Sequence, residues 1–111
     1  MGDVLYDFGT IELNEIVPFT FNFEKYSSFR GDTPEVISSI AFVVYLASDT
    51  TQTPITGMVF GSSFGNNFAV ARIGQAVVPM TAGDYHVRCR VTCSSGSRYE
   101  EQGAFVVAET Q

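Results

Sequence analysis

Apolar and polar side chains alternate along much of this chain, and the clearest alternation lies in its last third. In residues 85–93 the odd positions are Tyr, Val or Cys, and the even positions are His, Arg or Thr. A period of two is typical of a β-strand with one buried and one exposed face. A Gly-Asp pair precedes the segment and a Ser-Ser-Gly run follows it, and both favour turns. The inward face is expected to carry Tyr85, Val87, Cys89, Val91 and Cys93.

Two segments in the first half also predict strands. Residues 16–23 alternate, and Pro18 among them favours an edge strand or a strand start because it cannot donate a hydrogen bond. Their inward face is expected to carry Val17, Phe19, Phe21 and Phe23. Residues 36–47 are apolar on both faces, which is typical of a central strand or of an interface. Here Ile40, Phe42, Val44 and Leu46 are expected to face the core, and Ala41, Val43 and Tyr45 to face outward.

Shorter strands joined by turns are expected in the rest of the chain. They fall at residues 9–16, 55–60, 68–74, 75–80 and 99–109. Residues 24–35 predict a loop. Residues 57–67, rich in Gly and Asn with two Phe, predict either a mobile loop tip or a contact loop that becomes ordered on assembly.

This spacing of strands and turns predicts an all-β fold, an immunoglobulin-like antiparallel β-sandwich of seven to eight strands. Tyr85, at the start of its strand, resembles the tyrosine corner of such folds. We expect residues 1–15 to form an acidic N-terminal segment and residues 16–111 to form a single sandwich domain.

Composition and charge narrow the possible partners. Apolar residues make up 45% of the chain, enough for a packed core. The net charge is −6 with only one Lys and five Arg, which does not favour nucleic acid because phosphate binding depends on basic side chains. No apolar run approaches the length of a membrane span, and no basic leader precedes an apolar stretch, so neither a membrane nor a signal peptide is expected.

The two cysteines, Cys89 and Cys93, are expected to be reduced core residues. Four positions apart on one strand, their Cα atoms would lie roughly 13 Å apart. A disulfide requires about 7 Å or less. No second pair exists to complete a zinc site, and reduced thiols suit a protein that folds in a cytoplasm.

The sequence offers no catalytic set. His86 is the single histidine, with no nucleophile expected beside it, and the carboxylates are scattered rather than paired. We therefore expect no catalytic residues, no cofactor, no metal site and no enzyme activity. Arg30-Gly31-Asp32 spells an adhesion tripeptide, but its Gly-Asp-Thr-Pro context is already explained as a turn.

The best polar group of residues is the outward row His86, Arg88 and Arg90. The positive charge of this row is expected to be balanced in one of two ways: by Glu100 or Glu101 on the following strand, or by an acidic patch on a neighbouring subunit. The candidate interface residues are therefore His86, Arg88, Arg90, Val43, Tyr45, Phe60 and Phe64.

The order of short motifs resembles one known family. The motifs are Gly31-Asp32-Thr33, Ile37-Ser38-Ser39, the run from Ala82 to Val87, the run from Val91 to Arg98, and Phe105-Val106-Val107. From about Ile16 to Glu109 the chain is similar to the fiber-tail adaptor proteins of tailed bacteriophages, small immunoglobulin-like virion proteins. Members usually carry a Trp in the strand after the Gly-Asp-Thr turn, where this chain has Phe42 or Tyr45.

The resemblance implies a structural role, with no catalytic residues or cofactors to carry over. The expected function is a virion protein that links tail and fiber components through symmetric contacts. Its expected partners are other tail, fiber or capsid proteins and further copies of itself, after synthesis and folding in the bacterial cytoplasm. Two alternatives remain: a capsid decoration or head protein, and a carbohydrate-binding module that stacks sugars on Phe60, Phe64 and Tyr99.

Overall fold

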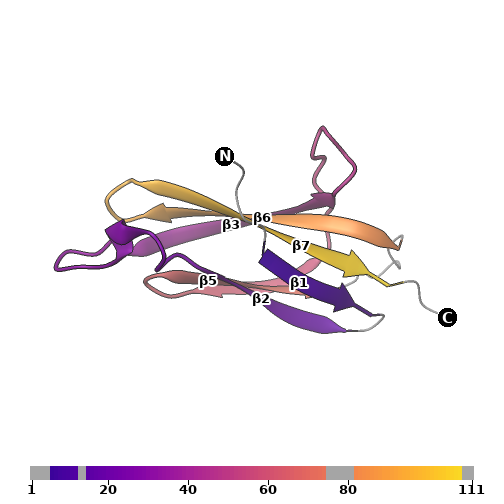
Figure 1. Cartoon of the computed structure of the whole chain (residues 1–111), viewed down its shortest axis with the longest axis horizontal. Helices are drawn as coiled ribbons and strands as arrows, with labels where there is room; N and C mark the ends of the chain where they lie inside the picture. The colour runs from indigo at the N-terminus through magenta and orange to yellow at the C-terminus, as the bar shows by residue number, and fades with distance from the viewer. Residues whose placement is uncertain (1–5, 13–14, 75–81, 109–111) are drawn as a thin grey trace.

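The computed structural model describes residues 6–12, 15–74 and 82–108, which form two β-sheets packed face to face (Figure 1). The large sheet has the order β1 (Tyr6–Ile11), β7 (Arg98–Val107), β6 (Gly83–Cys93) and β3 (Ile37–Leu46). The small sheet has the order β2 (Ile16–Asn22), β5 (Phe68–Gly74) and β4 (Val59–Phe64). The expected immunoglobulin-like sandwich is confirmed, with seven strands in the described part of the chain.

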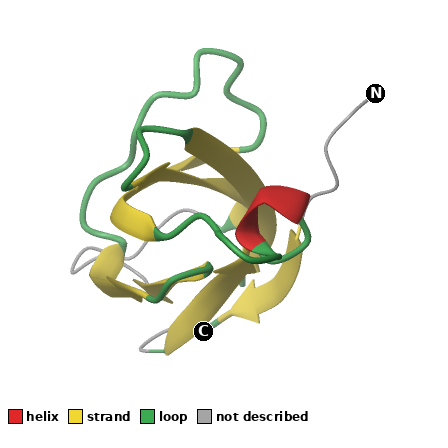
Figure 2. Ribbon diagram, turned by 90° about the vertical axis from the view of Figure 1, so that its left-hand side faces the viewer, coloured by secondary structure: helices red, strands yellow, loops and turns green. Residues whose placement is uncertain are grey.

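One helical turn, η1 (Ser27–Phe29), interrupts the expected loop between β2 and β3. Figure 2 views the sandwich from the end at which η1 lies, so that the two sheets appear as separate layers. The strand expected at residues 75–80 lies outside the described residues. The last strand begins at Arg98, one residue before its expected start.

The N-terminal strand corrects the expected domain boundary. Residues 1–15 were expected to form a segment outside the domain, with a strand at residues 9–16, whereas β1 covers Tyr6–Ile11 and β2 begins separately at Ile16. β1 pairs with β7 in parallel, so the sandwich is not wholly antiparallel. Residues 6–11 are therefore part of the large sheet.

Apolar side chains between the acidic residues explain why β1 joins the sandwich. Ile11 is fully buried. The Phe8 ring stacks on Phe19 with a centroid distance of 4.2 Å, and the Tyr6 ring meets Phe21 edge-on at 5.1 Å. In the sequence these apolar positions are interspersed with acidic residues, so no clear alternation marks the strand.

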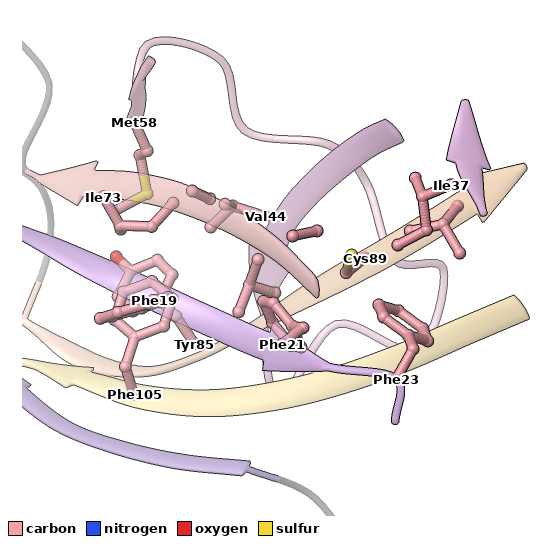
Figure 3. Packing of buried hydrophobic residues seen from close by; sticks show 14 of the residues in the cluster. Phe19, Phe21, Phe23, Ile37, Val44, Met58, Ile73, Tyr85, Cys89 and Phe105 are labelled. Carbon is pink, nitrogen blue, oxygen red and sulfur yellow. The ribbon is translucent and has the colours of Figure 1, made fainter. Parts of the chain in front are cut away.

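Aromatic side chains from both sheets fill the core (Figure 3). The Phe19 ring lies 5.2 Å from Phe105, and Phe105 stacks on Tyr85 at 5.6 Å. Phe19, Phe21 and Phe23 are at most 1% exposed, which confirms the inward face expected for residues 16–23. The five inward residues expected in β6 are also all buried, at 2% exposure or less.

β3 departs from the expected pattern near its end. Val44 is buried, and Ile40 and Phe42 are partly buried against the core. Leu46 was expected in the core but is 37% exposed, because it is the last residue of the strand. Tyr45 was expected on an open face but is only 2% exposed.

Most of the expected loop at residues 57–67 is a strand. β4 covers residues 59–64, and Asn66-Asn67 form the short turn into β5, which is closed by the Gly65 N–H donating to the Phe68 carbonyl at 3.0 Å. Gly61 interrupts the alternation of apolar and polar residues in β4. The pairing of β4 with β5 is irregular there, between Val59 and Ser62. Gly61 has a φ of 151°, which suits such a bulge.

Candidate functional site

The outer face of the large sheet brings together the candidate interface residues of β3 and β6. Tyr45 pairs with His86, and Val43 pairs with Arg88. Arg90 follows on the same face of β6, because the residues between these positions point into the core. The predicted outward row is therefore one continuous surface.

Arg90 has the cross-strand partner that the sequence predicted. Its Nε lies 2.7 Å from Glu100 Oε1 on β7. The two side chains are 59% and 41% exposed, so this ion pair contributes about 1 kcal/mol or less. Glu101, the other expected partner, instead pairs in register with the buried Cys89 and faces inward.

Arg88 belongs to a cluster that the sequence did not reveal. Its Nη1 donates to Gln52 Oε1 at 2.5 Å, and its guanidinium carbon lies 5.9 Å from the centre of the Tyr45 ring. Tyr45 in turn meets His86 edge-on, with ring centroids 5.6 Å apart. Among the described residues, the buried Nε of Arg88 has no hydrogen-bond partner.

The loop between β3 and β4 carries Gln52 to this cluster and lies above the large sheet in Figure 1. Asp49 organises the loop by accepting hydrogen bonds from the Thr51 hydroxyl, the Thr53 N–H and the Thr51 N–H. These bonds, led by the Thr51 hydroxyl, lower the pKa of Asp49 to about 2. The Asp-Thr-Thr-Gln-Thr run is the signal that could have predicted this folded loop.

A groove of about 400 Å³ lies beside Arg90 at one end of the face. Its lining includes Arg98, Glu100 and Thr92. No described acidic side chain lies within ion-pair distance of Arg98. This end of the face is therefore basic.

A second groove, of about 210 Å³, lies at the other end of the face. Its lining includes Asp7 of β1, together with Asp84 and His86 of β6. Asp84 and Arg90 are six positions apart along β6, or about 20 Å in an extended strand. The outer face thus carries an acidic end and a basic end.

Phe60 and Phe64 lie on the small sheet and not beside the Arg row. They are 44% and 42% exposed. Phe60 sits over Gly74 next to Ile16, since a Cβ on Gly74 would lie 3.3 Å from the Phe60 ring and 2.9 Å from Ile16. Phe64 pairs in register with the buried Ala69, so it does not share the face on which Phe60 lies. The candidate interface residues therefore do not form a single surface.

The aromatic set of the carbohydrate-binding alternative is not brought together. Tyr99 lies on β7, where its ring packs against Phe29 at 5.0 Å and Tyr26 at 5.1 Å. Its hydroxyl lies 2.5 Å from the Ser28 hydroxyl. It belongs to the end of the core near η1 and offers no stacking platform with Phe60 and Phe64, which are on the other sheet.

The buried carboxylate of Glu101 binds two side chains from the segment after β2. Lys25 Nζ lies 2.5 Å from its Oε1, and the Tyr26 hydroxyl donates to its Oε2. Although partial burial of Lys25 opposes the effect, the hydrogen bond and charge of Glu101 raise the pKa of Lys25. These contacts fasten the segment after β2 to β7.

The two cysteines and the Arg-Gly-Asp turn lie as the sequence predicted. Cys89 and Cys93 are free and buried, as predicted. Arg30, Gly31 and Asp32 are exposed in the turn after η1, where Gly31 has a φ of 98°. No group of three His, Cys, Asp or Glu in the described ranges could hold a metal ion, and no helix there is long and apolar enough to cross a membrane.

The comparisons with known proteins do not assign a family. A scan against protein-family models finds no match, and a search of curated proteins finds none either. Among solved structures, the chain is similar to part of a 2,6-sialyltransferase of Vibrionaceae Photobacterium sp. JT-ISH-224, in a complex with CMP and lactose. The TM-score is 0.43 at 12% identity, and the match covers 96% of this chain but 18% of the enzyme. A likeness at this level carries no argument about activity.

Proposed function

We propose that this protein is a structural component of a tailed-phage virion, an immunoglobulin-like adaptor that links tail and fiber components through symmetric protein–protein contacts. The resemblance of its short motifs to the fiber-tail adaptor family suggests the role. The observation that carries the proposal is the charge-separated outer face of the large sheet. Three of the six cations of an acidic chain lie on this face, Arg88 near its middle and Arg90 and Arg98 toward one end.

This face suits assembly better than it suits catalysis. The hydroxyl side chains of Ser39 and Thr92 line the groove beside Arg90, whereas His86 lines the groove at the other end of the face, so these groups are not brought together. Arginine pairs with carboxylates through two parallel hydrogen bonds, which fixes orientation as well as adding affinity. A face with opposite charges at its two ends can meet the same face of another copy, or an acidic surface of another virion protein.

Complementation of a phage that lacks this chain tests the proposal. The double variant Arg90→Glu and Arg98→Glu should fold but enter particles at least tenfold less, because like charges then meet at the contact. Arg72→Glu is the matched control, since Arg72 is an exposed cation on the small sheet. Mass spectrometry of purified particles measures the incorporated chain, and thermal unfolding checks the fold of each variant.

Two results would contradict this function. Absence of the parent chain from purified particles would remove the virion role, and normal incorporation of the double variant would remove the proposed contact face. A capsid decoration protein is the second candidate, because the same face could bind a capsid surface. Immunogold labelling of the particle separates the two, with label at the tail expected here and label over the head supporting the alternative.

A further inference from the structure

Within residues 6–12, 15–74 and 82–108, the edge of the small sheet at β4 is open. A sandwich of two sheets has four edge strands, here β1 and β3 in the large sheet and β2 and β4 in the small one. Edge strands expose unpaired backbone groups that can pair with another chain, and proteins usually block them with charges, proline, bulges or covering loops. Each of these four edge strands is therefore expected either to carry such a block or to be open to pairing.

Three of the four edges carry a block. β1 contains Asp7 and an irregular register before Thr10. β2 contains Pro18, and the Tyr6 hydroxyl bonds to both backbone groups of Asn22, at 3.2 Å from its N and 3.0 Å from its O. At β3, the Val44 carbonyl accepts a hydrogen bond from the Ile55 N–H at 2.8 Å.

β4 also has a bulge, between Val59 and Ser62, but no described segment covers the regular stretch after it. Its sequence, VFGSSF, contains no charge and no proline. The Gly65 N–H donates to the Phe68 carbonyl of β5. In an antiparallel ladder every second residue bonds to the same neighbour, so the backbone groups of Ser63 also bond to β5. The backbone groups of Ser62 and Phe64 therefore point away from β5. Within the described part of the chain, these two residues have no other hydrogen-bond partner on that side.

Three apolar side chains of this strand are exposed, alongside Ser62 and Ser63. Val59, Phe60 and Phe64 are 38%, 44% and 42% exposed. The bulge lies between Val59 and Ser62, which leaves residues 62–64 as a regular stretch. An exposed apolar edge with free backbone groups is suited to strand addition.

We propose that β4 pairs antiparallel with β4 of a second copy of this chain, about a two-fold axis at Ser63. In this register Ser62 lies opposite Phe64 of the other copy, so both open residues of each strand are paired. Ser63 of one copy then lies opposite Ser63 of the other at the axis. A charged residue in this strand would lie close to the same charge on the second copy, and the two would repel each other. The absence of charge in β4 removes that repulsion, which favours a second copy over an unrelated strand.

The pairing joins two small sheets into one continuous six-stranded sheet. It covers the exposed Phe64 side chain and satisfies the backbone groups of Ser62 and Phe64. It also leaves the outer face of the large sheet free. The inference deepens the proposed function by naming one symmetric contact, and it uses a surface separate from the Arg face.

A charge swap at Ser63 tests this pairing. Sedimentation equilibrium of the purified parent chain should show a reversible dimer. Ser63→Asp and Ser63→Lys should each raise the dissociation constant by about tenfold or more, because like charges meet at the axis. An equal mixture of the two variants should form dimers again, since opposite charges then meet.

Thr20→Lys and Thr20→Asp are the matched controls. Thr20 lies on β2 in the same cross-strand row, with Val70 of β5 between it and Ser63, and it is exposed. These controls should dimerise like the parent. Amide hydrogen exchange should show the Ser62 and Phe64 amides protected in the dimer and fast in the Ser63 variants.

Three outcomes would overturn the pairing: a monomeric parent chain, a dimer that survives both Ser63 charges, or a mixture that stays monomeric. The result is also separable from the proposed function. A β4 dimer that is absent from particles contradicts the virion role alone. A chain that enters particles but shows no pairing through β4 contradicts this inference alone.

Discussion

At the scale of single residues, the lack of a side chain at Gly103 allows the first strand to pack against the sandwich. Gly103 lies on β7 opposite Tyr6 of β1 and faces the core. The Phe8 ring occupies the space where a side chain would stand, since a Cβ on Gly103 would lie 2.2 Å from it. Glycine inside a strand often marks such a close approach. Gly103 therefore allows Phe8 to reach Phe19 in the core.

Gly103→Ala should destabilise the protein by about 1–3 kcal/mol, because the added methyl group displaces the Phe8 ring from a packed core. Urea unfolding followed by circular dichroism measures the change. Ala104→Val is the control, since Ala104 is the next residue on the opposite face, and it should change stability by about 0.5 kcal/mol or less. Equal stability of Gly103→Ala and the parent would mean that Phe8 does not pack there.

At the scale of elements, β1 joins a sheet that would otherwise end at β7. It pairs with β7 in parallel, although the other strand pairs of the described sandwich are antiparallel. Its one acidic residue, Asp7, is exposed, while Ile11 and the rings of Tyr6 and Phe8 pack against the core. The strand therefore closes one side of the core and is not an appendage.

Ile11→Ala tests whether β1 belongs to the folding unit. Ile11 is fully buried, so the truncation should cost about 2–5 kcal/mol. Thr10→Ala, at the exposed neighbouring position, should cost about 0.5 kcal/mol or less. Chemical denaturation of both variants gives the comparison. If Ile11→Ala matched Thr10→Ala, the first strand would contribute nothing to the stability of the sandwich.

At the scale of the whole molecule, packing two sheets together removes the Cys89 thiol from water. Burial, together with the charges of Glu101 and Glu100, raises the pKa of Cys89 to about 12 from an ordinary value of 9.0. Burial also raises the pKa of Cys93, with Glu35 adding to it. A thiol held neutral in this way is a poor nucleophile, which agrees with a role in the core.

The raised pKa of Cys89 predicts a loss of stability at alkaline pH. The unfolded chain releases the thiol proton near pH 9 while the folded chain retains it, so the contribution is complete below pH 9 and declines as the pH rises toward 12. Between pH 9 and pH 10.5, the stability advantage of the parent over Cys89→Ala should fall by about 2 kcal/mol. Urea unfolding of both proteins at several pH values measures this gap. A gap independent of pH would contradict the inferred titration.

The pattern of side chains by itself determined the fold class and the faces of the best strands. Strict alternation placed Phe19 and Phe21 inward, and it placed the Arg88 and Arg90 side chains on the opposite face of β6 from the cysteines. It also predicted the pairing of Arg90 with Glu100 as one of two options. These predictions succeeded because a strand has a side-chain period of two, so a half-buried strand carries its register in local sequence.

Only the tertiary structure decided the features that depend on segments far apart in the chain. The burial of Tyr45 depends on a loop that folds back, and the parallel position of β1 depends on the space left by Gly103. Glu101 faces inward because Lys25 and Tyr26 reach it from another segment. The open edge of β4 exists because β5 pairs with only one of its sides and no described segment covers the other. Local alternation fixes which way a side chain points, but contacts between distant segments decide what it meets there.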